Sequence, residues 1–178
     1  MTFAGIATVV GERVASLYFC GRYPGLRRSF AIPSHLTAIE RGTLYRLAVG
    51  RKYFVEIGSY TGASACCFGA AIMAAGGDGR VVCIDTWKND AMTEGKRDTW
   101  SEFGKNTDAY DGLLVRIRGF SAEVSGRVSD IIPWVDFLFI DGDHTYEGVL
   151  NDWRTYAPLL APGAAIVFHD YGWSDGVR

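Results

Sequence analysis

Tyr53-Phe-Val-Glu-Ile-Gly-Ser-Tyr-Thr-Gly62 opens the stretch that decides the fold, and the apolar run Ala63-Ser-Ala-Cys-Cys-Phe-Gly-Ala-Ala-Ile-Met-Ala74 completes it. The β-branched and aromatic residues at the start predict a short buried strand over 53–57. Gly58 lets the chain turn sharply, and the Ala-rich run has the length of a helix. Strand, glycine turn and helix form the first half of a βαβ unit, so the stretch predicts an α/β fold with a mostly parallel sheet.

The glycine spacing of this turn distinguishes between classes of ligand. A dinucleotide site has Gly-x-Gly-x-x-Gly around a pyrophosphate, whereas this chain has Glu56-x-Gly58-x-x-x-Gly62, with Tyr60 in place of a middle glycine. A zwitterionic ligand fits better, because an acidic residue can bind its ammonium group and the helix N-terminus can bind its carboxylate. The alternative is a strand-to-helix turn that binds nothing.

Composition limits the class of protein. The chain has 178 residues, of which 48% are apolar, and a net charge of −2, which predicts one globular α/β domain. No basic stripe is visible, so we expect no nucleic-acid partner. The N-terminus predicts neither a signal peptide nor a membrane span. The cysteines lack Cys-x-x-Cys spacing and are predicted to be reduced core residues of a cytoplasmic protein: Cys20, Cys66, Cys67 and Cys83.

Two units are expected along the chain. Residues 1–33 are predicted to form a helix and a loop, and residues 34–178 the main domain. The N-terminal helix would carry one apolar face, and the main domain would begin with a helix over 37–49 whose N-cap is Ser34. The residues of that apolar face are Val10, Val14, Leu17 and Tyr18.

The second predicted strand, over 80–85, ends in Asp85. A carboxylate at this point can accept hydrogen bonds from both hydroxyls of a ribose, although Asp85 can also simply cap a turn. A polar insertion over 86–111 follows. In it, Trp87 is either a wall against a ligand or a residue packed under the loop. A third strand over 113–118 leads to Ser121, a candidate helix cap.

Polar side chains follow the last two predicted strands. The strand over 137–140 ends in Asp141-Gly-Asp-His144, and the strand over 164–168 ends in His169-Asp170. Because neighbouring parallel strands end at the same edge of a sheet, we expect these acids and histidines to lie together. Two interpretations stay open: a divalent cation such as Mg²⁺, or a metal-free pocket in which His144 or His169 is a general base.

These segments together resemble class I S-adenosylmethionine (SAM) methyltransferases, whose fold is a Rossmann-like, doubly wound, mostly parallel sheet. Ile140-Asp-Gly-Asp-His-Thr-Tyr146 resembles more closely the small-molecule O-methyltransferase branch with an Asp-Gly-Asp-His-x-Tyr signature. That branch includes macrolide-sugar O-methyltransferases and cephalosporin hydroxylase-like relatives. The resemblance implies methyl transfer from SAM to a hydroxyl oxygen of a small molecule, and it implies that residues 1–33 cover the active site.

The resemblance also assigns roles to residues. Glu56, Gly58 and Gly62 would hold the amino-acid end of SAM, Asp85 would hold the ribose, and Ser121 and Ala122 would lie by the adenine. The other residues expected to contact the cofactor are Ser59, Thr86, Trp87 and Asp141. His144, His169 and Asp141 would be catalytic, and Asp141, His169 and Asp170 would bind a divalent metal. Related enzymes often have two acids, or an acid and an amide, where this chain has His169-Asp170.

The sheet of that family has seven strands, and this sequence stops after the fifth. We therefore expect either missing C-terminal residues or a homo-oligomer formed through an exposed sheet edge. Two other functions stay open: a SAM-binding module without catalysis of its own, and a nucleotide-sugar or dinucleotide enzyme, which the glycine spacing disfavours.

Overall fold

The computed structural model describes residues 3–89 and 95–178. Residues 1–2 of the predicted N-terminal unit and residues 90–94 of the predicted insertion lie outside this part of the chain. A five-stranded parallel sheet with the order β3-β2-β1-β4-β5 forms the centre of the molecule. This confirms the predicted Rossmann-like α/β fold. The strands are β1 (Tyr53–Ile57), β2 (Arg80–Asp85), β3 (Leu114–Arg118), β4 (Val135–Ile140) and β5 (Leu160–Phe168).

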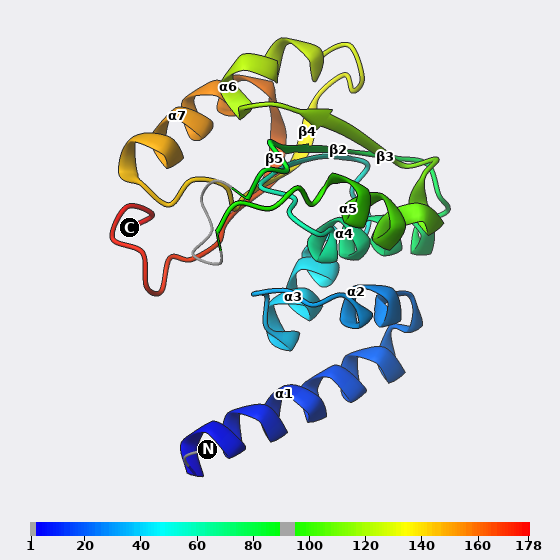
Figure 1. Ribbon diagram of the computed structural model, residues 1–178. Helices are drawn as coiled ribbons and strands as arrows, with labels where there is room; N and C mark the ends of the chain where they lie inside the picture. Colours follow the sequence, from blue (N-terminus) through cyan, green and yellow to red (C-terminus); the bar gives the residue numbers. More distant parts are fainter. Residues whose placement is uncertain (1–2, 90–94) are drawn as a thin grey trace.

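Helices cover both faces of this sheet (Figure 1). The first two strands are nearly all buried, as expected for strands covered on both sides. One face carries α3 (Ala38–Ala48), α4 (Ala63–Ala74) and α5 (Trp100–Thr107), and the other carries α6 (Ser121–Val124) and α7 (Tyr146–Tyr156). The remaining elements are α1 (Phe3–Arg22), α2 (Arg27–Ala31) and short 3-10 turns at Pro24–Leu26, Asp108–Tyr110, Ser125–Arg127 and Ala157–Leu159.

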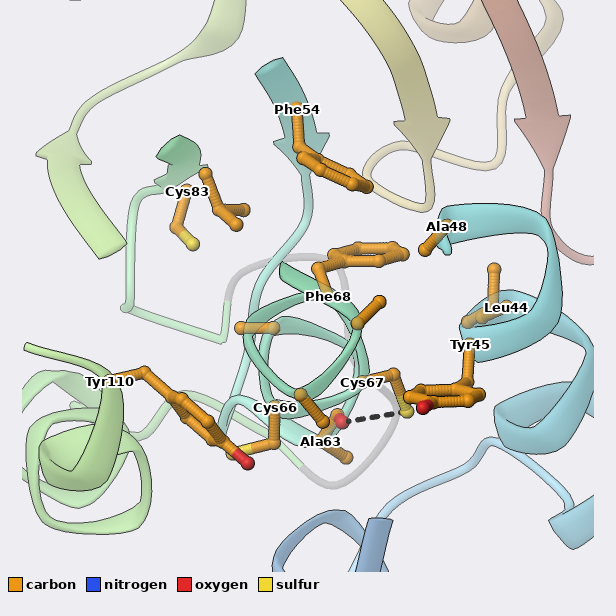
Figure 2. Close-up of a cluster of buried hydrophobic side chains, with 14 of the residues drawn as sticks. Leu44, Tyr45, Ala48, Phe54, Ala63, Cys66, Cys67, Phe68, Cys83 and Tyr110 are labelled. Carbon is orange, nitrogen blue, oxygen red and sulfur yellow. Dashed lines mark hydrogen bonds between the residues drawn. The ribbon is translucent and has the colours of Figure 1, made fainter. Parts of the chain in front are cut away.

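Helix α4 packs directly on the sheet because its residues are small. Phe54 of β1 stacks on Phe68 of α4 with ring centroids 5.4 Å apart, and Figure 2 shows the cysteines of this cluster around them. Cys66, Cys67 and Cys83 are buried and free, and burial raises the pKa of the first two thiols to about 12. They act as small core residues, as the sequence predicts.

The N-terminal helix α1 lies farthest from the sheet and packs on α3 (Figure 1). The apolar face predicted for it points to solvent: Val10 is 54% exposed and Leu17 is 75% exposed. Within the described part of the chain, no helix is both long enough and apolar enough to cross a membrane.

The N-cap of α3 differs from the prediction. Thr37, not Ser34, is the N-cap, and its hydroxyl accepts a hydrogen bond from the Glu40 backbone N–H at 3.2 Å. The Glu40 carboxylate in turn accepts from the Thr37 backbone N–H at 2.7 Å, which completes a capping box. Ser34 instead accepts from the Leu36 N–H at 3.1 Å, so it shapes the turn before the helix.

Candidate functional site

A cavity of about 860 Å³ lies along the carboxyl ends of the strands. This is where open parallel sheets bind ligands, and the strand order reverses beside β1. Most predicted site residues line it: Gly58, Ser59, Gly62, Asp85, Thr86, Ser121, Ala122, Asp141, His144, His169 and Asp170. Of the described residues from 3 to 33, none contributes to the lining, which begins at Ser34. A covering role for the N-terminal unit stays a prediction.

The turn between β1 and α4 needs glycine at two positions. Gly58 has a φ of +85°, and a Cβ there would lie 2.0 Å from the Asp141 carbonyl oxygen. Gly62 has a φ of +94°, and its Cβ would lie 2.6 Å from Thr107 Cγ2. Glycine thus lets the turn approach the end of β4 on one side and helix α5 on the other. Tyr60, which replaces the middle glycine, has a φ of +43°.

Glu56 lies under this turn and does not line the cavity. Its side chain is fully buried, and one oxygen accepts a hydrogen bond from the Ser59 hydroxyl at 2.7 Å. The other oxygen, Oε1, has no hydrogen-bond partner among the described residues. Burial raises the pKa of Glu56 to about 7. Glu56 is thus a buried acceptor with one oxygen that no described residue contacts, and its role toward an ammonium group stays a prediction.

Asp85 lines the cavity and is fixed by the backbone. Its two oxygens accept hydrogen bonds from Tyr60 N at 2.7 Å and from Trp87 N at 2.6 Å. Burial raises the pKa of Asp85, and these N–H donors oppose that rise. Each oxygen retains a second lone pair for a ligand hydroxyl. Trp87 does not line the cavity, because its fully buried ring packs edge-on against Trp100 at 4.8 Å between centroids.

Acids and histidines gather where β4 and β5 end. His144 Nε2 lies 2.8 Å from Asp170 Oδ2 and 4.0 Å from Asp141 Oδ1. Within the described part of the chain, Asp141, His144 and Asp170 place one ligand atom each within 4.8 Å of one another. This set contains His144, whereas the sequence interpretation placed His169 with the two acids. Trp173, which that interpretation missed, donates a hydrogen bond from Nε1 to Asp170 Oδ1 at 2.6 Å.

His169 contacts the same two aspartates and also Glu40. Its Nδ1 is 2.9 Å from both Asp141 Oδ1 and Asp170 Oδ1, and its Nε2 is 3.5 Å from Glu40 Oε1. Although burial lowers the pKa of His169, the three carboxylates together raise it to about 9. The pKa of His144 is also raised, chiefly by Asp141. In this arrangement His169 is protonated at neutral pH, and a protonated imidazole cannot accept a proton.

The cavity also contains a carboxylate that the sequence interpretation missed. Asp152 of α7 is only 4% exposed yet lines the cavity. It accepts a hydrogen bond from the Ser121 hydroxyl, so Ser121 does not cap α6, whose N-cap is Phe120. A signal for Asp152 exists in the sequence, because it lies three residues after Val149 and four before Tyr156, on the buried stripe of α7.

The charge of the lining is one-sided. Its described residues include five aspartates and three histidines and no lysine or arginine: Asp85, Asp141, Asp143, Asp152, Asp170, His35, His144 and His169. Five aspartates against three histidines favour a ligand with cationic groups. The lining therefore suits a compound that carries a sulfonium and an ammonium group.

Comparison with known proteins agrees with this geometry. Residues 55–171 match the family model described as a methyltransferase domain. The chain belongs to this family. A protein of Sinorhizobium fredii (strain NBRC 101917 / NGR234), y4gI, is 31% identical over 127 residues, which are 69% of this chain and 13% of that protein. The chain thus spans a small part of the length of the curated relatives it matches, 13% of one and 24% of another.

Three solved structures have a similar fold. Cofactor-bound Rv0187 from MTB has a TM-score of 0.65 at 20% identity, with 87% of this chain and 72% of that chain covered. The SAH-bound Podospora anserina methyltransferase PaMTH1 has a TM-score of 0.60 at 14% identity, with 90% of this chain and 69% of that chain covered. CalS11, a TDP-rhamnose 3'-O-methyltransferase of calicheamicin biosynthesis, has a TM-score of 0.57 at 19% identity, with 76% of this chain and 64% of that chain covered. The chain is therefore a methyltransferase domain with the fold of SAM-dependent enzymes.

Proposed function

We propose that this methyltransferase domain transfers the methyl group of SAM to a hydroxyl oxygen of a small molecule. The observation that carries the proposal is the cavity lining, which has five aspartates and, among its described residues, no lysine or arginine. SAM carries a sulfonium and an ammonium group, which suit such a lining. Family membership supports methyl transfer, and CalS11 supports oxygen as the acceptor atom.

The proposed orientation of SAM follows from the sheet. The amino-acid end lies over the Gly58–Gly62 turn, above Glu56, and the ribose lies at Asp85 of β2. The sulfonium then faces the ends of β4 and β5, where Asp141 and His144 border the cavity. The acceptor oxygen attacks the methyl carbon in line with the sulfur, the carbon–sulfur bond breaks, and the hydroxyl proton leaves for a base. Alignment supplies most of the acceleration, up to ~7–11 kcal/mol in well-oriented reactions.

The acid–histidine group suits two tasks in this reaction. Asp141, His144 and Asp170 would hold a divalent cation, which when bound would lower the pKa of the acceptor hydroxyl. His169 contacts the carboxylates of Asp141 and Asp170 and would fix their orientation. In a metal-free reaction, His144 is the proton acceptor, because its side chain is 28% exposed at the cavity, against 13% for His169.

Replacement of Asp141 tests this proposal. Asp141→Ala should abolish methyl transfer from labelled SAM to a panel of small hydroxylated compounds, while binding of S-adenosylhomocysteine (SAH) changes little. Unchanged turnover would remove Asp141 from the mechanism. The alternative, a SAM-binding module without catalysis, predicts SAH binding and no transfer to any compound of the panel, with or without Mg²⁺ or EDTA.

A further inference from the structure

Helix α1 has an apolar stripe that is open to solvent. Four of its apolar side chains are each more than half exposed: Val10, Val14, Leu17 and Tyr18. At about 100° per residue, these four positions fall within an arc of about 100° around the helix axis. Apolar side chains that are exposed singly are common, but a contiguous exposed stripe is typical of a site that binds another surface.

The opposite face of α1 is fixed to α3. The Glu12 carboxylate accepts a hydrogen bond from the Ala38 backbone N–H at 2.7 Å. The ring of Phe19 lies against Gly42, where a Cβ would clash with it. Because these contacts occupy the inner face, the helix cannot turn its apolar stripe inward without losing them. The stripe therefore faces away from the sheet, on the outermost layer of the molecule (Figure 1).

Two arginines border this stripe. Arg13 and Arg22 are exposed, and each lies about 40° beyond one edge of the stripe around the helix axis. Neither arginine forms an ion pair with another described residue. Glu12 is the one acidic residue of α1, and its carboxylate is turned toward α3. An apolar stripe between basic residues is the pattern of helices that lie in a membrane interface.

The charges of the whole chain are divided in the same way. Residues 1–52, which precede β1, contain eight lysines and arginines and two acidic residues, whereas residues 53–178 contain ten and eighteen. The net charges of the two parts are therefore +6 and −8. An anionic surface attracts the first part and repels the second, which orients the molecule with α1 toward that surface. A second copy fits the stripe less well, because two stripes face to face would bring arginines together without a free carboxylate.

We propose that α1 is a membrane-surface helix. Its apolar stripe enters the interface of a bilayer rich in anionic phospholipids, and Arg13 and Arg22 contact the lipid phosphates. This inference goes beyond the proposed function, and it differs from the sequence interpretation, which expected no membrane partner. A helix that lies in the interface needs neither the length nor the uniform apolarity of a membrane span.

Flotation with lipid vesicles tests the inference. The unmodified chain should bind vesicles of phosphatidylcholine and phosphatidylglycerol in equal parts, and much less to vesicles of phosphatidylcholine alone. Added salt should weaken this binding, because it screens the charges. Leu17→Ser should weaken it by roughly tenfold, because the stripe then buries less apolar surface in the bilayer. The double variant Arg13→Gln/Arg22→Gln should also lose on the order of tenfold.

Met73→Ser is the matched control. Met73 is an exposed apolar residue of α4, in the acidic part of the chain, so its replacement should leave vesicle binding unchanged. Thermal unfolding checks that Leu17→Ser and Met73→Ser fold like the unmodified chain, as the exposure of both positions predicts.

Failure of the unmodified chain to bind the anionic vesicles would overturn the inference and leave the proposed function intact. Full binding by Leu17→Ser would overturn it as well. If the unmodified chain binds no vesicles and Leu17→Ser lowers its oligomeric state in sedimentation velocity, a second copy covers the stripe and the inference is wrong.

Discussion

Gly58 and Gly50 have nearly the same backbone conformation in different surroundings. Their φ angles are +85° and +84°, but a Cβ on Gly58 would lie 2.0 Å from the Asp141 carbonyl oxygen, whereas nothing lies within 4 Å of one on Gly50. Both positions carry the cost of a positive φ for other residues. Only at Gly58 does the absence of a side chain also let the end of β4 approach the turn, and both Gly58 and Asp141 line the cavity.

Alanine at these two positions separates the two costs. Gly50→Ala should lower the free energy of unfolding by about 1 kcal/mol, the cost of the left-handed conformation. Gly58→Ala should cost on the order of 3 kcal/mol or more, because the backbone of the β1–α4 turn or of β4 must move. Urea denaturation measures both values. Equal losses would mean that the turn does not pack against Asp141 in this way.

Glu56 makes stability depend on pH. Burial raises its pKa from 4.5 to about 7, so the folded chain holds this proton more tightly than the unfolded chain. Its contribution to stability is complete below pH ~4.5 and is lost as the pH rises to ~7 and above, on the order of 3 kcal/mol in total.

A Glu56→Gln variant should lack this contribution. Relative to the unmodified chain, the variant should gain stability as the pH rises from 4.5 to about 7 and then level off, measured by urea denaturation at a series of pH values. Glu123→Gln, at an exposed position of α6, is the control and should follow the unmodified chain. If the free energy of unfolding of Glu56→Gln has the same pH dependence as that of the unmodified chain, the Glu56 carboxylate is not buried as described.

At the scale of elements, helix α3 connects its own capping box to the site. Glu40 accepts hydrogen bonds from Thr37 through Oε2, and its Oε1 faces His169 at 3.5 Å. Thr37→Ala should cost about 1 kcal/mol in the free energy of unfolding, because the N-terminus of the helix loses a cap. Thr37→Ser retains the hydroxyl and should restore most of the free energy of unfolding that Thr37→Ala loses. A thermal-unfolding series in which Ala and Ser behave alike would argue against the cap.

The strands were the elements easiest to predict. Most are short apolar runs, and the parallel order brings the residues that follow them to one edge of the sheet. The start of α3 was predicted wrongly, because Ser34 and Thr37 are both good caps and only the Glu40 partner decides between them. Trp87 could not be placed, because its packing on Trp100 depends on how the insertion folds back. Asp152 was missed because helical periodicity was applied to apolar residues alone.

At the scale of the whole molecule, the two edges of the sheet differ. The edge strand β3 carries the exposed Arg116 and Arg118, which discourage pairing with another chain. The edge strand β5 has no charged residue and exposes Ile166 by 39%. In the described part of the chain it pairs only with β4. An uncharged, partly apolar edge of this kind favours association.

We therefore expect the purified chain to self-associate through β5. Sedimentation velocity over a range of concentrations should show an oligomer that Ile166→Lys shifts to monomer, because a charge then lies on the edge. Val115→Lys on β3 should leave the oligomer intact. A monomer at every concentration, or association that Ile166→Lys does not change, would contradict pairing at this edge.

The central claim is that the acidic cavity at the carboxyl edge of the sheet binds SAM. Calorimetric titration of the purified chain with SAH, in parallel with NAD, tests it most directly. The account predicts micromolar binding of SAH and none of NAD, because Tyr60 replaces the middle glycine through which a dinucleotide-binding turn approaches the pyrophosphate. Binding of NAD without binding of SAH would contradict it.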